Sequence, residues 1–301
     1  MRAQAAMLPE RRPLPSGSTC GAYRSPDRPS AEVDPMSLCC ARPNRTPTMD
    51  DSAIIEIVVQ RLRAEFDADL LGVLAGGSRL RGEGDANSDL DIVVVIAHPQ
   101  RRRWNLMIEG VEIEMFINPA IQMRQYFEEE RLSGRGQMPH LCATGRVVFD
   151  PQGIMATLQA EARSVWKVGP PPLSKRDHWQ FRYHTADLLR DIEDVRVSDE
   201  ENAAFLVALL LSQLIDRHYR ISGRWLHKPK RAIHDLAQWD ALASRLARQA
   251  CSSKTAITGR CAAIRALADH VLAPLGGVMP VELSTEWETV ATQDEAAHSP
   301  R

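Results

Sequence analysis

The stretch from residue 76 to residue 96 constrains the fold of this chain more than any other part of it. It reads Gly76-Gly77-Ser78-Arg79-Leu80-Arg81-Gly82-Glu83-Gly84-Asp85-Ala86-Asn87-Ser88-Asp89-Leu90-Asp91 and continues as the apolar run 92–96. Side chains alternate across a strand, so Asp89 and Asp91 must point to the same side where the strand 90–96 begins. Two like charges this close repel each other unless a cation lies between them. Mg²⁺ is the natural candidate because it prefers oxygen ligands, and the pair therefore predicts a magnesium site.

The glycine-rich turn before the two aspartates predicts an anion site. Residues 70–75 are expected to form a strand and residues 78–81 a short helix, with Gly76 and Gly77 at the junction. Backbone N–H groups at such a junction are not obstructed by side chains, and an anion is favoured there. An ordinary loop followed by two strand-entry aspartates is the alternative, but it does not explain why both features occur at this spacing.

Taken together, Gly77-Ser78, Gly82 and Ser88-Asp89-Leu90-Asp91 resemble the signature of the DNA polymerase beta nucleotidyltransferase superfamily. The resemblance covers residues 70–119. It implies a small α/β domain with a mixed sheet and a third carboxylate on a neighbouring strand. It also implies a bound nucleoside triphosphate and Mg²⁺.

Residues 106–117 supply two candidates for the third carboxylate. Glu109-Gly110 is typical of a hairpin turn, and beyond it Glu112, Glu114 and Phe116 share one face of a strand. Minimal and antibiotic-type nucleotidyltransferases carry an acidic residue, a short apolar run and then Asn-Pro, which Glu114 to Asn118-Pro119 match. We therefore predict Glu114 as the ligand. Glu112 is either a general base near the acceptor hydroxyl or a solvated strand residue.

The resemblance implies transfer of a nucleoside monophosphate, AMP from ATP, to a hydroxyl of a small molecule, with release of pyrophosphate. Paired Mg²⁺ ions can stabilise the attacking and leaving oxygens of such an in-line displacement. The predicted metal ligands are Asp89, Asp91 and Glu114. The predicted triphosphate-binding residues are Gly76, Gly77, Ser78, Arg79, Arg81, Lys228 and Lys230. A solvated helix face is the alternative interpretation of the arginines.

Composition sets outer limits. The chain has 301 residues and a formal net charge of −2, which argues weakly against a long duplex nucleic acid as substrate. Cysteines at positions 20, 39, 40, 142, 251 and 261 show no metal-binding spacing, so reduced thiols in a cytoplasmic protein are expected. The apolar run 203–211 is too short to cross a bilayer, and it predicts a buried helix instead.

The sequence divides into four parts. Residues 1–48 are rich in proline and lack apolar periodicity, which predicts a disordered extension or a misassigned start before Met49. Residues 49–150 are expected to form the nucleotidyltransferase domain, beginning with a helix capped by Asp51 or Ser52. Residues 151–292 follow a helical pattern and predict an all-α bundle that binds the substrate. Residues 293–301 are expected to be a flexible tail, and the fold class is α+β.

Two features of the helical half are candidates for substrate contact. Asp187, Asp191 and Asp194 form an acidic stripe on a helix expected to begin near Ser174, and the stripe either receives a cationic acceptor or is a solvated face. The turn 225–231 carries an aromatic residue and several cations, and it either reaches a triphosphate or is a surface loop. An antitoxin-like enzyme that adenylylates a partner protein or an RNA end is the alternative function. A non-catalytic nucleotide-binding relative is disfavoured by the intact acidic set.

Overall fold

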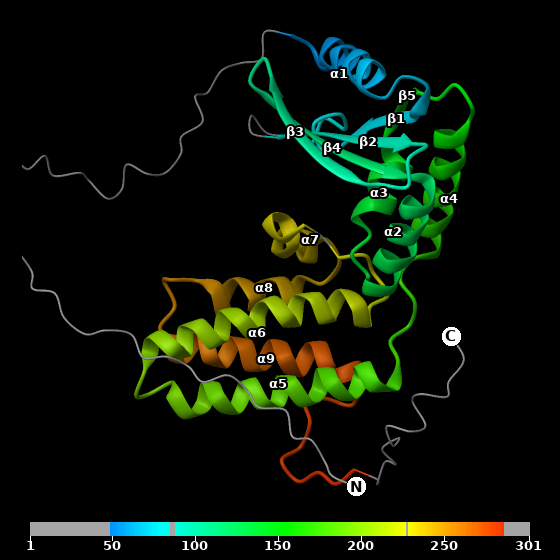
Figure 1. The fold of residues 1–301 in the computed structure, drawn as a ribbon. Coiled ribbons are helices and arrows are strands. Elements are labelled where there is room, and N and C mark those ends of the chain that lie inside the picture. Colours follow the sequence, from blue (N-terminus) through cyan, green and yellow to red (C-terminus); the bar gives the residue numbers. More distant parts are fainter. Residues whose placement is uncertain (1–48, 85–87, 227, 286–301) are drawn as a thin grey trace, which may run out of the picture. The chain divides into compact units, whose positions relative to one another are not determined.

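A five-stranded mixed sheet forms the first half of the computed structural model, which describes residues 49–84, 88–226 and 228–285. The strand order is β3-β4-β2-β1-β5 (Figure 1). The strands are β1 (Leu70–Gly76), β2 (Leu90–Ile96), β3 (Arg102–Ile108), β4 (Val111–Pro119) and β5 (Arg146–Phe149). Strands β2 and β4 run parallel, and the other neighbours are antiparallel. The sheet is therefore mixed, as the sequence predicted.

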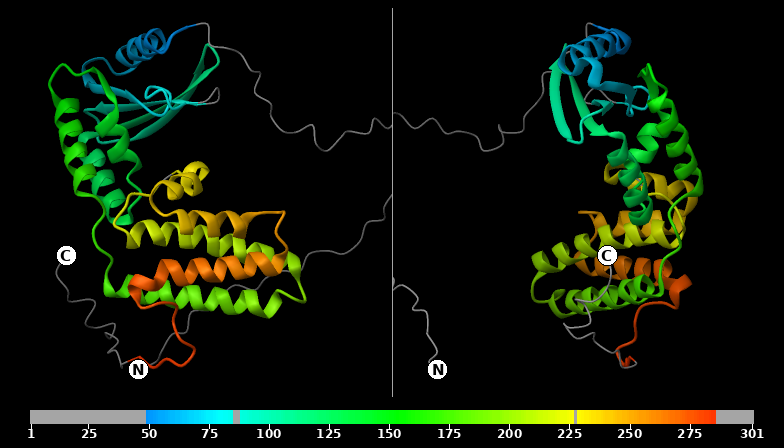
Figure 2. Two further views of the ribbon diagram at one scale, coloured as in Figure 1. Left: turned by 180° about the vertical axis from the view of Figure 1, so that it is seen from behind. Right: turned by 45° about the vertical axis from the view of Figure 1, so that its right-hand side comes forward.

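Helices cover both faces of the sheet (Figures 1 and 2). Helix α1 (Asp51–Phe66) packs its apolar stripe against the β2 side chains that alternate from Leu90 to Ile96. The opposite face is covered by α2 (Ala120–Ser133), α3 (Gln137–Thr144) and α4 (Ile154–Val168). Val93 and Val95 point to that second face. Asp91 shares their side of the strand and so faces α2 to α4.

The second half is a helical bundle. Its long members are α5 (Lys175–Val195), α6 (Glu200–Ile221), α8 (Ala241–Cys251) and α9 (Ile257–Leu272), with the shorter α7 (Ala232–Trp239) beside them. The described residues also form the short 3₁₀ turns η1 (Asp67–Asp69), η2 (Pro229–Arg231) and η3 (Ala273–Leu275). Helix α5 begins after Ser174 with a capping box to Asp177, as its sequence indicates. No helix of the described chain has the length and apolar character that crossing a bilayer requires.

Both halves belong to one unit that spans residues 45–301. Backbone and side-chain hydrogen bonds join them: Leu226 N donates to Gly134 O at 2.8 Å, and Arg231 Nη2 donates to Glu83 O at 2.8 Å. The architecture confirms the α+β class with a sheet half followed by helices. Helix α4 packs on the sheet, so the core of the first half extends to Val165.

Two local predictions are wrong. Residues 78–81 form turns and no helix, because Gly77 and Gly82 adopt φ values of 95° and 70° on either side of this short segment. The cap of α1 is Asp50, whose Oδ1 accepts from Ala53 N at 2.7 Å, and neither Asp51 nor Ser52 takes that place. The predictions for residues 1–48 and 293–301 lie outside the described residues.

Candidate active site

Three carboxylates come together where β2 begins, on the face of the sheet that α2 to α4 cover. In the parallel pairing of β2 with β4, Asp91 lies opposite Glu114, and across the antiparallel pair β1–β2 it lies opposite Gly76. Asp89 precedes β2 by one residue and faces the same way as Asp91. One carboxylate oxygen from each of Asp89, Asp91 and Glu114 lies within 4.8 Å of the others. The structure thus assembles the three residues that the sequence predicted as ligands.

The surroundings of Asp91 oppose its charge. Burial and the neighbouring Asp89 charge together raise the pKa of this carboxyl to about 6, although Lys228 counteracts both. Gly77 crosses directly above it with φ 95°, and a Cβ there would come within 2.5 Å of Asp91 Oδ2. Only glycine therefore fits at this position. These crowded and partly desolvated carboxylates repel one another, and this repulsion favours a cation between them.

Glu114 has one cationic neighbour in the cluster. Arg103 of β3 donates to Glu114 Oε1 at 2.6 Å, and its guanidinium lies 3.6 Å from the centre of the Phe116 ring. The donor set is made of hard carboxylate oxygens without sulfur or imidazole. This chemistry fits Mg²⁺ better than zinc or copper.

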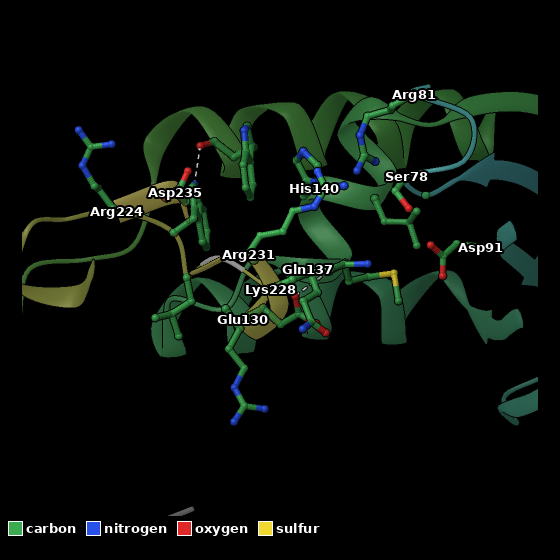
Figure 3. A pocket seen from close by; sticks show the side chains of 18 of the residues that line it. Ser78, Arg81, Asp91, Glu130, Gln137, His140, Arg224, Lys228, Arg231 and Asp235 are labelled. Carbon is green, nitrogen blue, oxygen red and sulfur yellow. Dashed lines mark hydrogen bonds between the residues drawn. The ribbon is translucent and has the colours of Figure 1, made fainter. Parts of the chain in front are cut away.

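The cluster opens into a cavity of about 810 Å³. Most of the predicted residues line it: Gly77, Ser78, Arg81, Asp89, Asp91, Glu114, Lys228 and Lys230. In Figure 3, Asp91, Ser78 and Arg81 lie at one end, Arg224 and Asp235 lie at the other, and Lys228 and His140 lie between. The cavity therefore extends from the sheet half to the helical half.

Three predicted residues do not line this cavity. Arg79 turns away and pairs with Asp51 of α1, with Nε 2.7 Å from Oδ1. Gly76 borders a neighbouring small pocket of about 120 Å³. Glu112 lies two positions from Glu114 on β4, paired with Met107 of β3. Its place on the strand agrees with the predicted face, but its side chain is not part of the lining.

Sequence reasoning missed much of the helical end of the cavity. Trp166 of α4, Tyr219 of α6 and Asp235 of α7 line it, as does Arg135 before α3. Their separation in the sequence gives no signal that they meet. Arg231 lies in the turn that the sequence singled out and also lines the cavity.

The acidic stripe of α5 does not contribute to the cavity. Asp187, Asp191 and Asp194 are exposed and absent from the lining, and Asp187 pairs with Arg190 at 3.1 Å. This placement favours the solvated-face interpretation of the stripe.

Residues 55–138 match the family model described as a nucleotidyltransferase domain. This match confirms the resemblance read from the motif: residues 55–138 are a nucleotidyltransferase domain. Among solved structures, the chain is similar to a nucleotidyltransferase-like protein from Exiguobacterium sibiricum 255-15. The two are 14% identical with a TM-score of 0.42, over 73% of this chain and 75% of that chain. No curated protein matches the sequence.

Proposed function

We propose that this protein transfers AMP from ATP to a hydroxyl of a small molecule, in a Mg²⁺-dependent reaction that releases pyrophosphate. The observation that carries the proposal is the cluster of three carboxylates, with ligand oxygens within 4.8 Å of one another, on the wall of the large cavity. A structural role alone would not favour three like charges at this distance, because each raises the cost of ionising the others.

Asp89, Asp91 and Glu114 would hold the metal. When bound, Mg²⁺ offsets the negative charge that develops on the attacking and leaving oxygens. Arg103 positions Glu114 through the hydrogen bond to Oε1, which leaves Oε2 for the ion. Removing one ligand is therefore expected to impair metal binding more than it impairs folding.

The triphosphate is assigned to the end of the cavity nearest the cluster. Ser78 and the amides around Gly77 would bind the β- and γ-phosphates, and Arg81, Lys228 and Lys230 would add positive charge. Arg79 is less suited to this role because it pairs with Asp51. Gly76 would contribute through its backbone.

In the reaction, the acceptor oxygen forms a bond to the α-phosphorus, and the bond from that phosphorus to the bridging oxygen breaks. Pyrophosphate leaves, and the hydroxyl proton passes to a base. Glu112 is either this general base or a solvated strand residue. Its side chain does not line the cavity, which favours the solvated strand residue. Residues 151–292 are proposed to bind the acceptor, since this half supplies part of the cavity wall.

The alternative acceptors are a partner protein, as in an antitoxin-like enzyme, and an RNA end. The cations in the lining are the observation that favours RNA between these two.

The donor chemistry is tested with ATP labelled on either its α- or its γ-phosphate. The full chain is incubated with Mg²⁺ and a panel of hydroxyl compounds, with EDTA as the metal-free control. Transfer of the α-label with release of pyrophosphate is expected, and EDTA should stop it. Transfer of the γ-label would contradict the proposal, because that product requires phosphoryl transfer instead.

A further inference from the structure

A stack of aromatic rings lies at the helical end of the cavity. The rings of Trp166 and Trp225 are parallel within 3°, with centroids 4.9 Å apart, and His140 lies 4.6 Å from Trp166. Trp225 Nε1 donates to the carbonyl oxygen of Trp166 at 3.0 Å, which fixes the pair. Gly136 lies beneath both indoles, and a side chain there would collide with them. All four residues line the cavity, so they present a fixed aromatic platform there.

Three cations that line the same cavity are chain neighbours of these residues. Lys167 follows Trp166, Arg224 precedes Trp225 and Arg135 precedes Gly136, so each is the chain neighbour of a platform residue. All three are exposed and line the cavity. Among the residues that the structure describes, no carboxylate lies within 4.0 Å of them as an ion-pair partner. Arg224 packs over the Trp239 ring instead, with its guanidinium 4.5 Å from the ring centre.

The acidic groups at this end already have donors of their own. Asp235 Oδ2 accepts from the Tyr219 hydroxyl at 2.5 Å and from Trp239 Nε1 at 3.2 Å. Glu130 Oε2 accepts from Met138 N at 2.7 Å, at the first turn of α3. These carboxylates therefore hold the wall together. Glu130 also attracts Arg135, whereas Lys167 and Arg224 have no carboxylate ion-pair partner among the described residues.

The charge of the lining exceeds what the triphosphate needs. Eight lysines and arginines line the described cavity, against three carboxylates once the metal cluster is set aside. Arg81 and Lys228 act directly on Asp91 and so lie near the triphosphate end. Arg224 lies at the opposite end (Figure 3). A triphosphate that binds together with Mg²⁺ has much of its charge compensated by the metal, which leaves Arg224 at the opposite end without a role in donor binding.

We propose that the acceptor is itself a nucleotide, whose base packs on the platform of His140, Trp166 and Trp225 and whose phosphate binds Arg135, Lys167 and Arg224. This inference rests on the proposed function and names its acceptor class. Flat rings beside cations are the combination that binds bases together with phosphates. A free nucleotide and the terminal nucleotide of an RNA share this chemistry. A hydroxyl of its ribose would attack the α-phosphorus of ATP, with pyrophosphate as the leaving group.

The test is binding and transfer with the full chain. One arm uses nucleoside monophosphates and a second uses a hexaribonucleotide, both with MgATP at saturation, and neutral sugars and aminoglycosides serve as the comparison. The variant Lys167→Glu/Arg224→Glu reverses two of the three cations. Lys175→Glu/Arg245→Glu is the matched control, because it reverses one exposed lysine and one exposed arginine that do not line the cavity. Arg135→Glu/Lys167→Glu is the second variant, and melting curves confirm that each variant folds.

We expect the nucleotide or the hexamer to bind and to receive the α-label. The two charge-reversal variants should lower kcat/KM for that acceptor by about tenfold or more, with the affinity for MgATP unchanged. The control variant should keep the wild-type kcat/KM. Labelling by mononucleotides alone would identify a free nucleotide as the acceptor, and labelling by the hexamer alone would identify an RNA end.

Three results would overturn the inference. One is transfer restricted to sugars or aminoglycosides, and another is the absence of nucleotide binding while MgATP binds normally. The third is a loss of MgATP affinity in the two charge-reversal variants, which would mean that this end of the cavity binds the ATP donor. If MgATP itself does not bind, the proposed function fails, so the two failures are distinguishable.

Discussion

The two halves of this protein each contain a three-residue cluster of the kind that holds metal ions, and the clusters differ in how they are satisfied. Asp89, Asp91 and Glu114 lie on the sheet, and His218, Asp240 and His270 lie in the helical bundle. In the bundle, Asp240 Oδ2 lies 2.7 Å from Nε2 of both histidines, and its Oδ1 accepts from Ala243 N at 2.9 Å. On the sheet, no described side chain donates to Asp89 or Asp91 through a hydrogen bond, and Arg103 reaches only Glu114.

The two clusters shift the pKa of their central carboxyl group in opposite directions. Burial alone would raise the pKa of Asp240, but the Ala243 amide and the two histidines lower it to about 2. Burial and Asp89 raise the pKa of Asp91 to about 6. An ionised Asp240 can only accept hydrogen bonds. Nε2 of each histidine therefore carries the proton in its hydrogen bond to Asp240. The Asp240 carboxylate thus has protein donors on both oxygens, whereas Asp89 and Asp91 have no side-chain donor among the described residues.

The largest expected effect is on catalysis. Asp91→Asn should lower pyrophosphate release from ATP and acceptor by about 10³-fold or more, equivalent to about 4 kcal/mol. The melting temperature should not fall, because the substitution removes a buried like charge. Asp194→Asn is the control, since Asp194 is exposed and outside the cavity. Comparable turnover of Asp91→Asn and the wild type would rule out the metal assignment.

The second effect separates the two glutamates of β4. Glu114→Gln should reduce kcat by about 10²-fold and shift the Mg²⁺ titration to higher concentrations, because a neutral amide is a weaker ligand. Glu112→Gln should leave the Mg²⁺ titration unchanged and alter the pH profile only if Glu112 is the base. A Mg²⁺ titration shifted by Glu112→Gln alone would reverse the assignment.

The sequence predicted the sheet cluster but not the far end of the cavity. Strand β2 occupies the predicted residues, and Glu109-Gly110 forms the expected turn with φ values of 48° and 81°. Both follow from local rules, and the register then places Glu114 beside Asp91. Trp166 and Trp225 stack only because the two halves dock, which no local pattern records. The helix predicted for residues 78–81 failed because two glycines with positive φ flank it.

The third effect concerns stability. Asp240→Ala removes the cap of α8 and the acceptor of two histidines, so we expect a loss of about 2–3 kcal/mol in the free energy of unfolding. Asp199→Ala is a matched control, since Asp199 caps α6 without histidine partners and its loss should destabilise the fold clearly less. Chemical denaturation measures both. If both variants lose the same free energy of unfolding, the hydrogen bonds from Asp240 to the two histidines contribute nothing to stability. The bundle cluster would then not be stabilised by its own hydrogen bonds.

The smallest effect is a pH dependence of stability that belongs to His218. Burial lowers the pKa of this imidazole, and the hydrogen bond to Asp240 opposes the shift only in part. His218 Nδ1 is buried and has no hydrogen-bond partner among the described residues, so a proton there would find no acceptor. The unfolded chain then takes up this proton more readily than the folded one. Stability from His218 is therefore present above a pH of about 6.5 and is lost progressively as the pH falls below that value.

Melting temperatures between pH 5 and pH 7.5 test this for wild type, His218→Gln and His234→Gln, where His234 is an exposed histidine of α7. The wild type and His234→Gln should lose stability in parallel as the pH falls, and His218→Gln should lose less. The Asp240 carboxylate stays ionised throughout this range because its pKa is about 2, so it does not contribute to the slope. If His218→Gln shows the wild-type slope, the unpaired Nδ1 carries no cost, and the bundle cluster is less complete than its hydrogen bonds indicate.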